Sequence, residues 1–279
     1  MRLKVIQINI YHGKFLDKLI SFLRGEQPDI ITMQEVSGGR VNFWADQRMD
    51  IFQHLRSALG LEGVVAPMFR LIGDSSSYES NAVLARGKIL ASNTVQLKAY
   101  RDYSDLLWEK DGPEMPRNAL DVIVRFSPPA RGGSPLLPEE GRGVVGEEGV
   151  GEGIFHILST HGAWTKAPVD TPEKIRQARL LAEYLRGLGD EPFILGGDFN
   201  MEPGSEVIRI LDKAASNTCY GSGINNTLNL RTHRAAEVLG AGRLVDFIYT
   251  SPHFRVESID APEVDVSDHL PVRAMLSWT

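Results

Sequence analysis

The chain of 279 residues has few of the features that cross-link a protein or anchor it in a membrane. Cys219 is the only cysteine, so an intrachain disulfide cannot form and a cysteine-based zinc site is not expected. No run of about 18 apolar residues is present, which argues against a membrane-spanning helix. The N-terminal residues lack the apolar stretch and the small-residue cleavage site of a secretory signal. Together these absences predict a cytoplasmic protein.

Basic residues are neither in excess nor concentrated in one segment. Lys and Arg number 30 against 36 Asp and Glu, and the formal net charge of -6 argues against a protein that coats nucleic acid non-specifically. This charge is compatible with an enzyme that binds phosphate groups through a metal ion. The sequence also lacks a G-x-x-x-x-G-K-[ST] phosphate loop and a G-x-S-x-G serine elbow. Neither a phosphate-cradling loop nor a serine nucleophile at an elbow is therefore expected.

Strand and helix patterns alternate along a chain of ordinary globular composition, 42% hydrophobic and 24% charged. Residues 3–10 predict a strand, residues 14–24 have apolar side chains at helical spacing with Gly25 ending the helix, and residues 29–34 predict a second strand. This order indicates a layered α/β fold. The other predicted elements are a helix over 172–187, capped by Thr171, and strands over 81–86, 89–98, 119–126, 154–160, 193–195, 244–249 and 271–276.

One segment differs in composition from the rest of the chain. Residues 127–153 contain eight of the 27 glycines, four of the 15 prolines, and five glutamates against two arginines. Such a segment has too little apolar surface to order itself by burial. Because it lies between two strand-like runs, we interpret it as an excursion between neighbouring strands and not as a domain boundary.

Carboxylates and amides follow apolar runs where strands are predicted to end. Asp198 and Asn200 come after residues 193–195 and two glycines, at the carboxyl end of a strand, where open α/β sheets place ligands. Glu35 emerges from the second strand in the same way and suits a hard cation that prefers oxygen ligands. Each segment taken alone is also compatible with an ordinary turn or surface residue.

Two histidines are placed for chemistry of a different kind. His161 closes the strand over 154–160, and His269 follows Asp268 directly before the final strand. Asp246 lies in an apolar run, where a carboxylate needs a partner, and is the candidate to orient the ring of His269. Asn9, inside the first strand, also needs a hydrogen-bond partner. Oxygen ligands beside a histidine–carboxylate pair favour a metal-assisted water as the nucleophile.

These segments, in this order, resemble the endonuclease/exonuclease/phosphatase superfamily, which includes pancreatic deoxyribonuclease, exonuclease III and neutral sphingomyelinases. The resemblance implies one domain over residues 1–279, with the excursion at about 127–153 inside it. It implies an α/β (α+β) four-layer sandwich in which two mainly antiparallel sheets pack face to face with helices outside. The matching segments are Gln7–Asn9, Met33–Glu35, Glu79–Leu84, Ser159–His161, Gly197–Asn200, Arg243–Ile248 and Ser267–Pro271.

The resemblance also implies roles at the reacting phosphate. Glu35 is expected to bind Mg²⁺, for which Mn²⁺ can substitute, with Asn9 and Asp268 in the metal shell. Asp198, or else His269 paired with Asp246, is expected to take the proton of the attacking water. The remaining implied roles are phosphate contacts from His161 and Asn200, substrate contacts from Asn81, Arg117 and Trp164, and a supporting carboxylate, Glu79, that partners a histidine.

The expected activity is hydrolysis of a phosphodiester, with nucleic acid as the favoured substrate. Many members of the superfamily cleave DNA or RNA, and Trp164 and Phe199 lie close in sequence to predicted site residues and can stack on a base. A lipid head group or an inositol phosphate is the alternative substrate. The glutamates of residues 127–153 disfavour contact with anionic lipid, and the sequence shows no dense basic pocket for an inositol phosphate.

A family member that only binds a partner is a further alternative, disfavoured because every expected catalytic residue is present. The histidines outside the matching segments, His12, His54, His156, His233 and His253, are assigned as structural or surface residues. The number of metal ions, endo- or exo-action, diester or monoester preference and oligomeric state stay open.

Overall fold

Two six-stranded sheets form the centre of the protein, in a computed structural model that describes residues 1–104, 114–127 and 152–278. The first sheet has the order β11-β12-β1-β2-β4-β3 and the second the order β5-β6-β7-β8-β10-β9. The strands of the first are β1 (Arg2–Asn9), β2 (Ile30–Gly38), β3 (Glu62–Leu71), β4 (Asp74–Ala85), β11 (Phe254–Asp260) and β12 (Val272–Trp278). Those of the second are β5 (Lys88–Lys98), β6 (Arg117–Phe126), β7 (Gly153–His161), β8 (Phe193–Asp198), β9 (Ser216–Asn217) and β10 (Asp246–Thr250).

Each sheet has one parallel pair at its centre and antiparallel pairs around it. The parallel pairs are β1 with β2 and β7 with β8. All other neighbouring strands in the two sheets are antiparallel. The two strands of a parallel pair end on the same side of their sheet. Each sheet therefore has two carboxyl strand ends next to each other.

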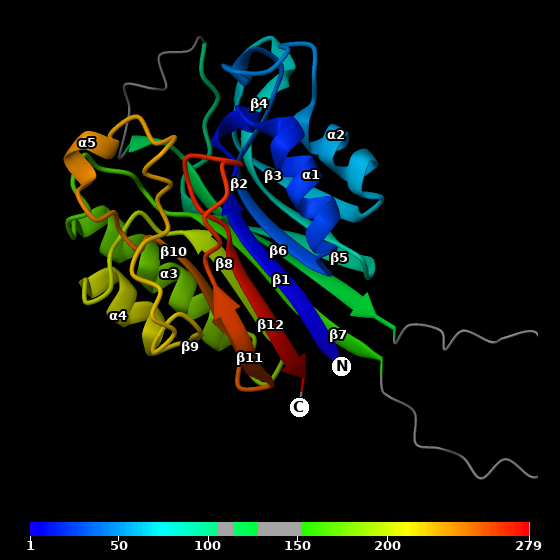
Figure 1. The fold of residues 1–279 in the computed structure, drawn as a ribbon, viewed down its shortest axis with the longest axis vertical. Helices are drawn as coiled ribbons and strands as arrows, with labels where there is room; N and C mark the ends of the chain where they lie inside the picture. The colour runs from blue at the N-terminus through cyan, green and yellow to red at the C-terminus, as the bar shows by residue number, and fades with distance from the viewer. Residues whose placement is uncertain (105–113, 128–151, 279) are drawn as a thin grey trace, which may run out of the picture.

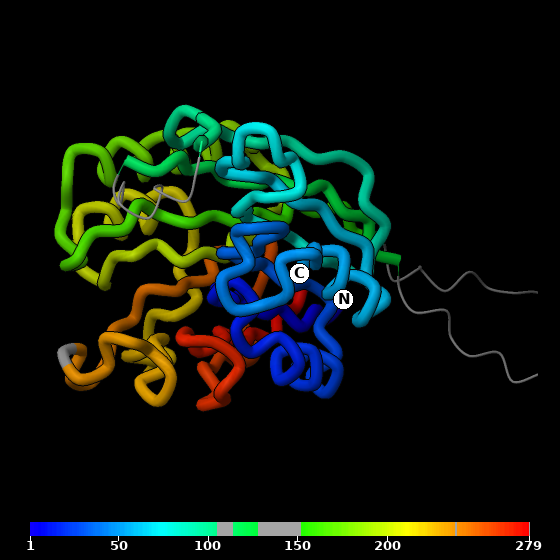
Figure 2. Tube along the Cα trace, turned by 90° about the horizontal axis from the view of Figure 1, so that it is seen from above, coloured from blue at the N-terminus to red at the C-terminus, as the bar shows by residue number. Residues whose placement is uncertain are grey.

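Helices cover the outer face of each sheet, which gives the four layers expected from the sequence (Figure 1). One side carries α1 and α2, and the other carries α3 and α4. Viewed from above, the blue N-terminal and red C-terminal segments lie together, while the green strands form the other half (Figure 2). The helices are η1 (Tyr11–Gly13), α1 (Leu16–Glu26), η2 (Gly39–Val41), α2 (Ile51–Leu59), α3 (Pro172–Gly187), α4 (Glu206–Asp212) and α5 (Ala236–Leu239).

The alternation of side chains along β1 explains why this strand is apolar on both faces. Ile6, Ile8 and Ile10 pack in one cluster with residues of α1 and α2, whereas Leu3 and Val5 belong to the core between the sheets. Because neighbouring side chains in a strand point to opposite faces, the inward row continues from these apolar residues to polar ones near the strand's carboxyl end. The core is therefore apolar in its depth and polar at one rim.

Most predicted elements are confirmed, but several boundaries differ, such as those of the predicted helix over 14–24 and the start of the strand predicted over 81–86. Gly25 lies inside α1, which continues to Glu26, and Gln27 ends the helix in a left-handed conformation (φ 50°). Thr171 caps α3 as predicted, because its side chain accepts a hydrogen bond from the Lys174 backbone N–H at 3.2 Å. The sequence interpretation did not include β3, β9, β11, α2, α4 or α5.

Two further predictions concern the segment over 127–153 and the absence of a membrane-spanning helix. The excursion over 127–153 lies outside the described residues except for Ser127, Glu152 and Gly153. Within the described part of the chain, no helix has the length and apolar character needed to cross a membrane.

Candidate active site

The candidate site lies where the carboxyl ends of the two parallel strand pairs face each other. The inward rows of β1 and β2 end in polar side chains, and Gln7 and Gln34 are fully buried between the sheets. Gln34 donates to the hydroxyl oxygen of Ser159 on β7 at 3.1 Å, which joins the two sheets directly. Gln7 donates to a carboxylate oxygen of Asp246 on β10 at 3.4 Å. Buried amides thus fix one sheet against the other beside the site.

The sequence predicted Glu35 at the end of the second strand. In the structure it lies within β2, which continues to Gly38. The pairing of β2 with β4 shifts register between Met33 and Val36, and Glu35 has a left-handed backbone (φ 55°). A bulge of this kind re-aims a side chain at the cost of local strain. The carboxylate of Glu35 reaches Asn9, whose amide nitrogen donates to it at 3.1 Å.

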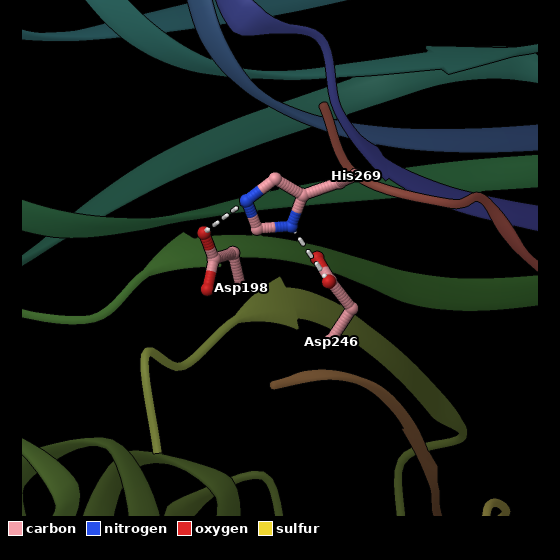
Figure 3. A group of neighbouring side chains, drawn as sticks. All are labelled: Asp198, Asp246 and His269. Atoms are coloured by element: carbon pink, nitrogen blue, oxygen red, sulfur yellow. Dashed lines mark hydrogen bonds and ion pairs between the residues drawn. The ribbon is translucent and has the colours of Figure 1, made fainter. Parts of the chain in front are cut away.

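Asp246 and His269 form the pair that the sequence predicted, with Asp198 on the other side of the ring (Figure 3). The Nδ1 atom of His269 lies 2.8 Å from Asp246, and its Nε2 atom lies 3.7 Å from the Oδ2 atom of Asp198. Asp198 and Asp246 are direct partners in the antiparallel pairing of β8 with β10. The three groups lie close enough to hold a metal ion. However, the Nδ1 atom of His269 and an oxygen of Asp246 already contact each other, so this pair of atoms is less suited to binding a metal ion.

One oxygen of Asp198 is the meeting point of several site residues. Besides His269, the Nε2 atom of His161 lies 3.5 Å from this Oδ2 atom, and the amide nitrogen of Asn9 donates to it at 3.1 Å. Its other oxygen accepts the backbone N–H of Asn200 at 2.9 Å. Asp198 is therefore held in one orientation, and Asn9 links it to Glu35.

Carboxylates crowd the side of the site nearest β2. Burial, with the neighbouring charge of Glu35, raises the pKa of Asp268 to about 6, and the same causes raise the pKa of Glu79 to about 7. Ser267 donates to Asp268 at 3.3 Å and to the backbone carbonyl of Asn9 at 2.7 Å. Repulsion among buried carboxylates is relieved when a divalent cation binds them.

The two site histidines carry opposite pKa shifts. Burial disfavours the charged form of His269, but the carboxylates of Asp246, Asp198 and Asp268 outweigh it and hold its pKa well above the usual value. Burial and the guanidinium of Arg117 lower the pKa of His161 to about 3. These shifts favour the charged form of His269 and the neutral form of His161.

His12, assigned to the surface or to a structural role, lies at the site. Its Nε2 atom is 3.3 Å from Glu35 and 3.9 Å from Glu79. Glu79 was expected to partner a histidine, and the histidine beside it is His12. In the described residues, no hydrogen bond links Glu79 to His161, and the Nδ1 atom of His161 has no hydrogen-bond partner. The signal available in the sequence was the position of His12 three residues after Asn9.

Arg117 and Lys174 are buried cations behind the site. Arg117 donates to the backbone carbonyl of Gly162 at 3.1 Å, and the side chain of Asn200 donates to the same carbonyl at 3.1 Å. Lys174 donates to Thr165 at 2.7 Å and to the backbone carbonyl of Asn200 at 3.4 Å. Both cations brace the loops that follow β7 and β8. Sequence reasoning did not single out Lys174, because a lysine at the start of an amphipathic helix resembles a surface residue.

The other residues that were predicted to contact substrate differ in how exposed they are. Asn81 is buried and donates to Asn118, and Trp164 is 51% exposed just past the end of β7. Phe199 is only 4% exposed and packs against Phe247 and Tyr249, so it cannot stack on a base. The substrate roles of Asn81, Arg117 and Trp164 stay predictions, as does the place of Asn9 in a metal shell.

Residues 6–269 match the model of the Endonuclease/Exonuclease/phosphatase family. The chain belongs to this family. Its members include nucleases, phosphatases and phosphodiesterases and are generally hydrolases of phosphoester bonds. Comparison with curated proteins found no match.

Solved structures share the fold over the whole chain. An endonuclease/exonuclease/phosphatase from Bacteroides vulgatus is 19% identical, with a TM-score of 0.68 and 100% of both chains covered. The human Nocturnin catalytic domain with a bound sulfate anion is 18% identical, with a TM-score of 0.64, over 100% of this chain and 95% of that one. A mannosyl-6-phosphatase from Bacteroides thetaiotaomicron is 16% identical, with a TM-score of 0.65, over 99% of this chain and 100% of that one.

Proposed function

We propose that this protein is a divalent-metal-dependent phosphodiesterase that cleaves nucleic acid with an activated water. The observation that carries the proposal is the convergence of two groups of side chains. One group is the His269–Asp246 pair with Asp198, and the other is Glu35 with Asp268. The amide of Asn9 donates to both Asp198 and Glu35 and so connects the two groups.

The carboxylates beside β2 fit a hard cation such as Mg²⁺. Glu35 and Asp268 supply oxygen ligands, and burial, with the neighbouring charge of Glu35, raises the pKa of Asp268 to about 6. When bound, such an ion neutralises charge on a non-bridging phosphate oxygen. Mn²⁺ prefers a similar set of oxygen ligands and can replace Mg²⁺ here.

The remaining chemistry is supplied by the chain's own groups. Asp198, held by Asn9 and the backbone of Asn200, orients the attacking water and takes its proton as the new O–P bond forms and the P–O bond to the leaving group breaks. The cationic ring of His269, oriented by Asp246, donates to the charge that develops on the phosphoryl oxygens. His161, neutral and buried beside Asp198, offers a second donor.

Nucleic acid is favoured as the substrate by the surface next to the site. The half-exposed ring of Trp164 follows His161 closely in the chain and can stack on any base without reading its sequence. Among the residues that the structure describes, no dense basic cluster marks the site as a pocket for a highly phosphorylated small molecule. The buried cations Arg117 and Lys174 donate to the protein's own backbone.

The test is hydrolysis of bis-p-nitrophenyl phosphate with Mg²⁺ and with EDTA. We expect activity only with the metal, and we expect Glu35→Ala and His269→Ala to lower kcat by at least about 100-fold while the circular dichroism spectrum is unchanged. Tyr220→Ala, an exposed tyrosine after β9 that contacts Asp212 on α4, is the control. Near-normal turnover in either site variant would contradict the assignment.

A substrate panel separates the classes of phosphoester. Single-stranded DNA, abasic duplex DNA, RNA, sphingomyelin and inositol phosphates are compared at equal metal concentration. We expect the highest kcat/KM on a nucleic acid. Preference for sphingomyelin or an inositol phosphate would be consistent with the proposed phosphoesterase activity but would contradict nucleic acid as the substrate.

A further inference from the structure

An aromatic and cationic cluster lies on the surface near the carboxylate side of the site. The rings of Tyr11 and Trp44 have centroids 5.8 Å apart, and the Nζ atom of Lys14 lies 4.4 Å from the Trp44 ring centre and 4.9 Å from that of Tyr11. Trp44 is 51% exposed, whereas Tyr11 is buried. We call Tyr11, Lys14 and Trp44 the Trp44 platform.

The platform is connected to the reacting groups by the backbone that follows β1. The N–H of Tyr11 donates to the side-chain oxygen of Asn9 at 3.0 Å, and Asn9 in turn contacts Glu35 and Asp198. The next residue, His12, has its Nε2 atom 3.3 Å from Glu35. The platform therefore begins two residues from the site, on the side of the first sheet.

The ring of Trp44 is held in place and does not extend freely into solvent. Tyr11 packs against it, and the ammonium of Lys14 lies over it. Tyr11 and His12 both have left-handed backbones (φ 50° and 48°), which non-glycine residues adopt at a cost. Residues held in such conformations cluster at active sites and ligand clamps.

We propose that the Trp44 platform binds a nucleobase adjacent to the scissile phosphate, with Trp44 stacking on the base and Lys14 facing the neighbouring phosphate. The inference rests on the proposed function and deepens it. Aromatic rings stack on every base, and a lysine cation beside them tracks the phosphate backbone. Trp164 follows β7 in the second sheet, and Trp44 lies beyond the end of β2 in the first, so an aromatic ring is available from each sheet.

The surface around Trp44 is not a broad apolar face, which argues against insertion into a lipid bilayer. Arg48, on the same loop, is paired with Asp46 at 2.6 Å and adds no net positive charge. Asp46 and Gln47, close to Trp44 in the chain, are exposed and polar, so the ring is not part of a broad apolar surface. Binding to anionic membranes requires a basic or extended apolar patch.

The test compares substrates with and without a base. For a single-stranded oligonucleotide and for thymidine 5′-(p-nitrophenyl phosphate), we expect Trp44→Ala to raise KM by about fivefold or more, with kcat within about twofold. For methyl p-nitrophenyl phosphate, which has no base, KM should stay the same. Trp44→Phe should recover most of the affinity, and Tyr220→Ala, an exposed aromatic far from the site, is the control.

Binding is measured separately by fluorescence anisotropy of a labelled oligonucleotide in EDTA. We expect Trp44→Ala and Lys14→Met to weaken binding, and Lys14→Met also to flatten its dependence on salt. If the wild type cleaves the oligonucleotide and Trp44→Ala leaves both KM and binding unchanged, the platform proposal fails and the proposed function stands. If the wild type neither binds nor cleaves nucleic acid but hydrolyses another phosphoester, both fail.

Vesicles of phosphatidylcholine and phosphatidylserine provide the remaining comparison. The platform proposal predicts that Trp44→Ala leaves sedimentation with vesicles unchanged. Loss of vesicle binding in Trp44→Ala, with oligonucleotide binding intact, would identify the platform as a membrane contact and overturn the proposal.

Discussion

Gly196 lies where the two sheets approach each other closely. A Cβ atom placed on it would lie 2.0 Å from the hydroxyl of Thr32 and 2.9 Å from the side-chain oxygen of Gln7. Both neighbours belong to the buried polar network, in which Thr32 donates to Gln7 at 2.7 Å. Gly196 is therefore required for close packing between the two sheets, in addition to its position near the end of β8.

Gly196→Ala is predicted to lower the free energy of unfolding by about 1–3 kcal/mol, because an added methyl must displace Thr32 and Gln7. It should also lower kcat, since Gln7 contacts Asp246. Urea denaturation and the phosphodiester assay measure the two effects. Gly187→Ala, where a Cβ meets no atom within 4 Å, is the control. Equal stability of the two variants would contradict the prediction.

Residues at the site could be predicted where the sequence placed a polar group against an apolar strand. Asp246 was found in this way, and its contact with His269 is confirmed at 2.8 Å. His12 and Lys174 were missed for a physical reason. Their involvement depends on a left-handed turn after β1 and on the burial of the first turn of α3, neither of which residue spacing reveals.

At the scale of elements, α3 is fastened to the second sheet by a buried polar cluster distant from the site. Tyr184 on α3 donates to Asp121 on β6 at 2.6 Å, and the Nδ1 atom of His156 on β7 lies 2.8 Å from the same carboxylate. The Nε2 atom of His156 lies close to Glu191 as well. One histidine thus joins two strands and the segment after the helix.

This cluster predicts a pH-dependent contribution to stability. The hydrogen bond to Asp121 raises the pKa of His156, although burial opposes the shift. A histidine whose pKa is raised on folding stabilises fully below its unfolded pKa of about 6.5 and loses that contribution as pH rises through the folded pKa. The difference in unfolding free energy between wild type and His156→Gln should therefore be larger at pH 6 than at pH 9.

Urea denaturation at the two pH values measures this difference. Tyr184→Phe serves as the comparison, because it removes a hydrogen bond to Asp121 without removing the titrating group. A difference for His156→Gln that grows between pH 6 and pH 9 would show that the ring is not stabilised as a cation.

The elements that the sequence did not reveal have weak apolar patterns, for reasons that differ from one element to the next. β11 is an edge strand whose side chains are mostly exposed, so its apolar pattern is weak. The first half of β4 is rich in serine and carries little apolar signal, which is why only residues 81–86 were predicted there. α2 spans Ile51–Leu59 and is too short to give a long helical repeat. Central strands, buried on both faces, were the most readily recognised.

At the scale of the whole molecule, binding of the divalent ion is predicted to stabilise the fold. The carboxylates that would hold it come from β2 and from the segment before β12, which are far apart in the sequence. A ligand that binds only the folded state adds about 2.7 kcal/mol at 100 times its dissociation constant. Mg²⁺ or Mn²⁺ should therefore raise the melting temperature, and EDTA should reverse the rise.

Glu35→Ala should abolish most of this increase, because it removes a predicted ligand without disturbing the core. Differential scanning calorimetry with and without metal measures it, and Glu257→Ala, whose carboxylate pairs with Arg2 on the surface, is the matched control. The same metal-induced increase in Glu35→Ala and wild type would place the ion elsewhere.

The division of the site between two sheets gives the protein a built-in sensitivity to their alignment. Glu35 and Asn9 belong to one sheet, and Asp198, His161 and Asp246 to the other. A small slide of one layer over its partner would separate the ion's ligands from the proton acceptor while leaving every reactive side chain intact. Substitutions at Gln34 or Ser159, which hold the layers together without touching phosphate, should therefore slow turnover by misalignment alone.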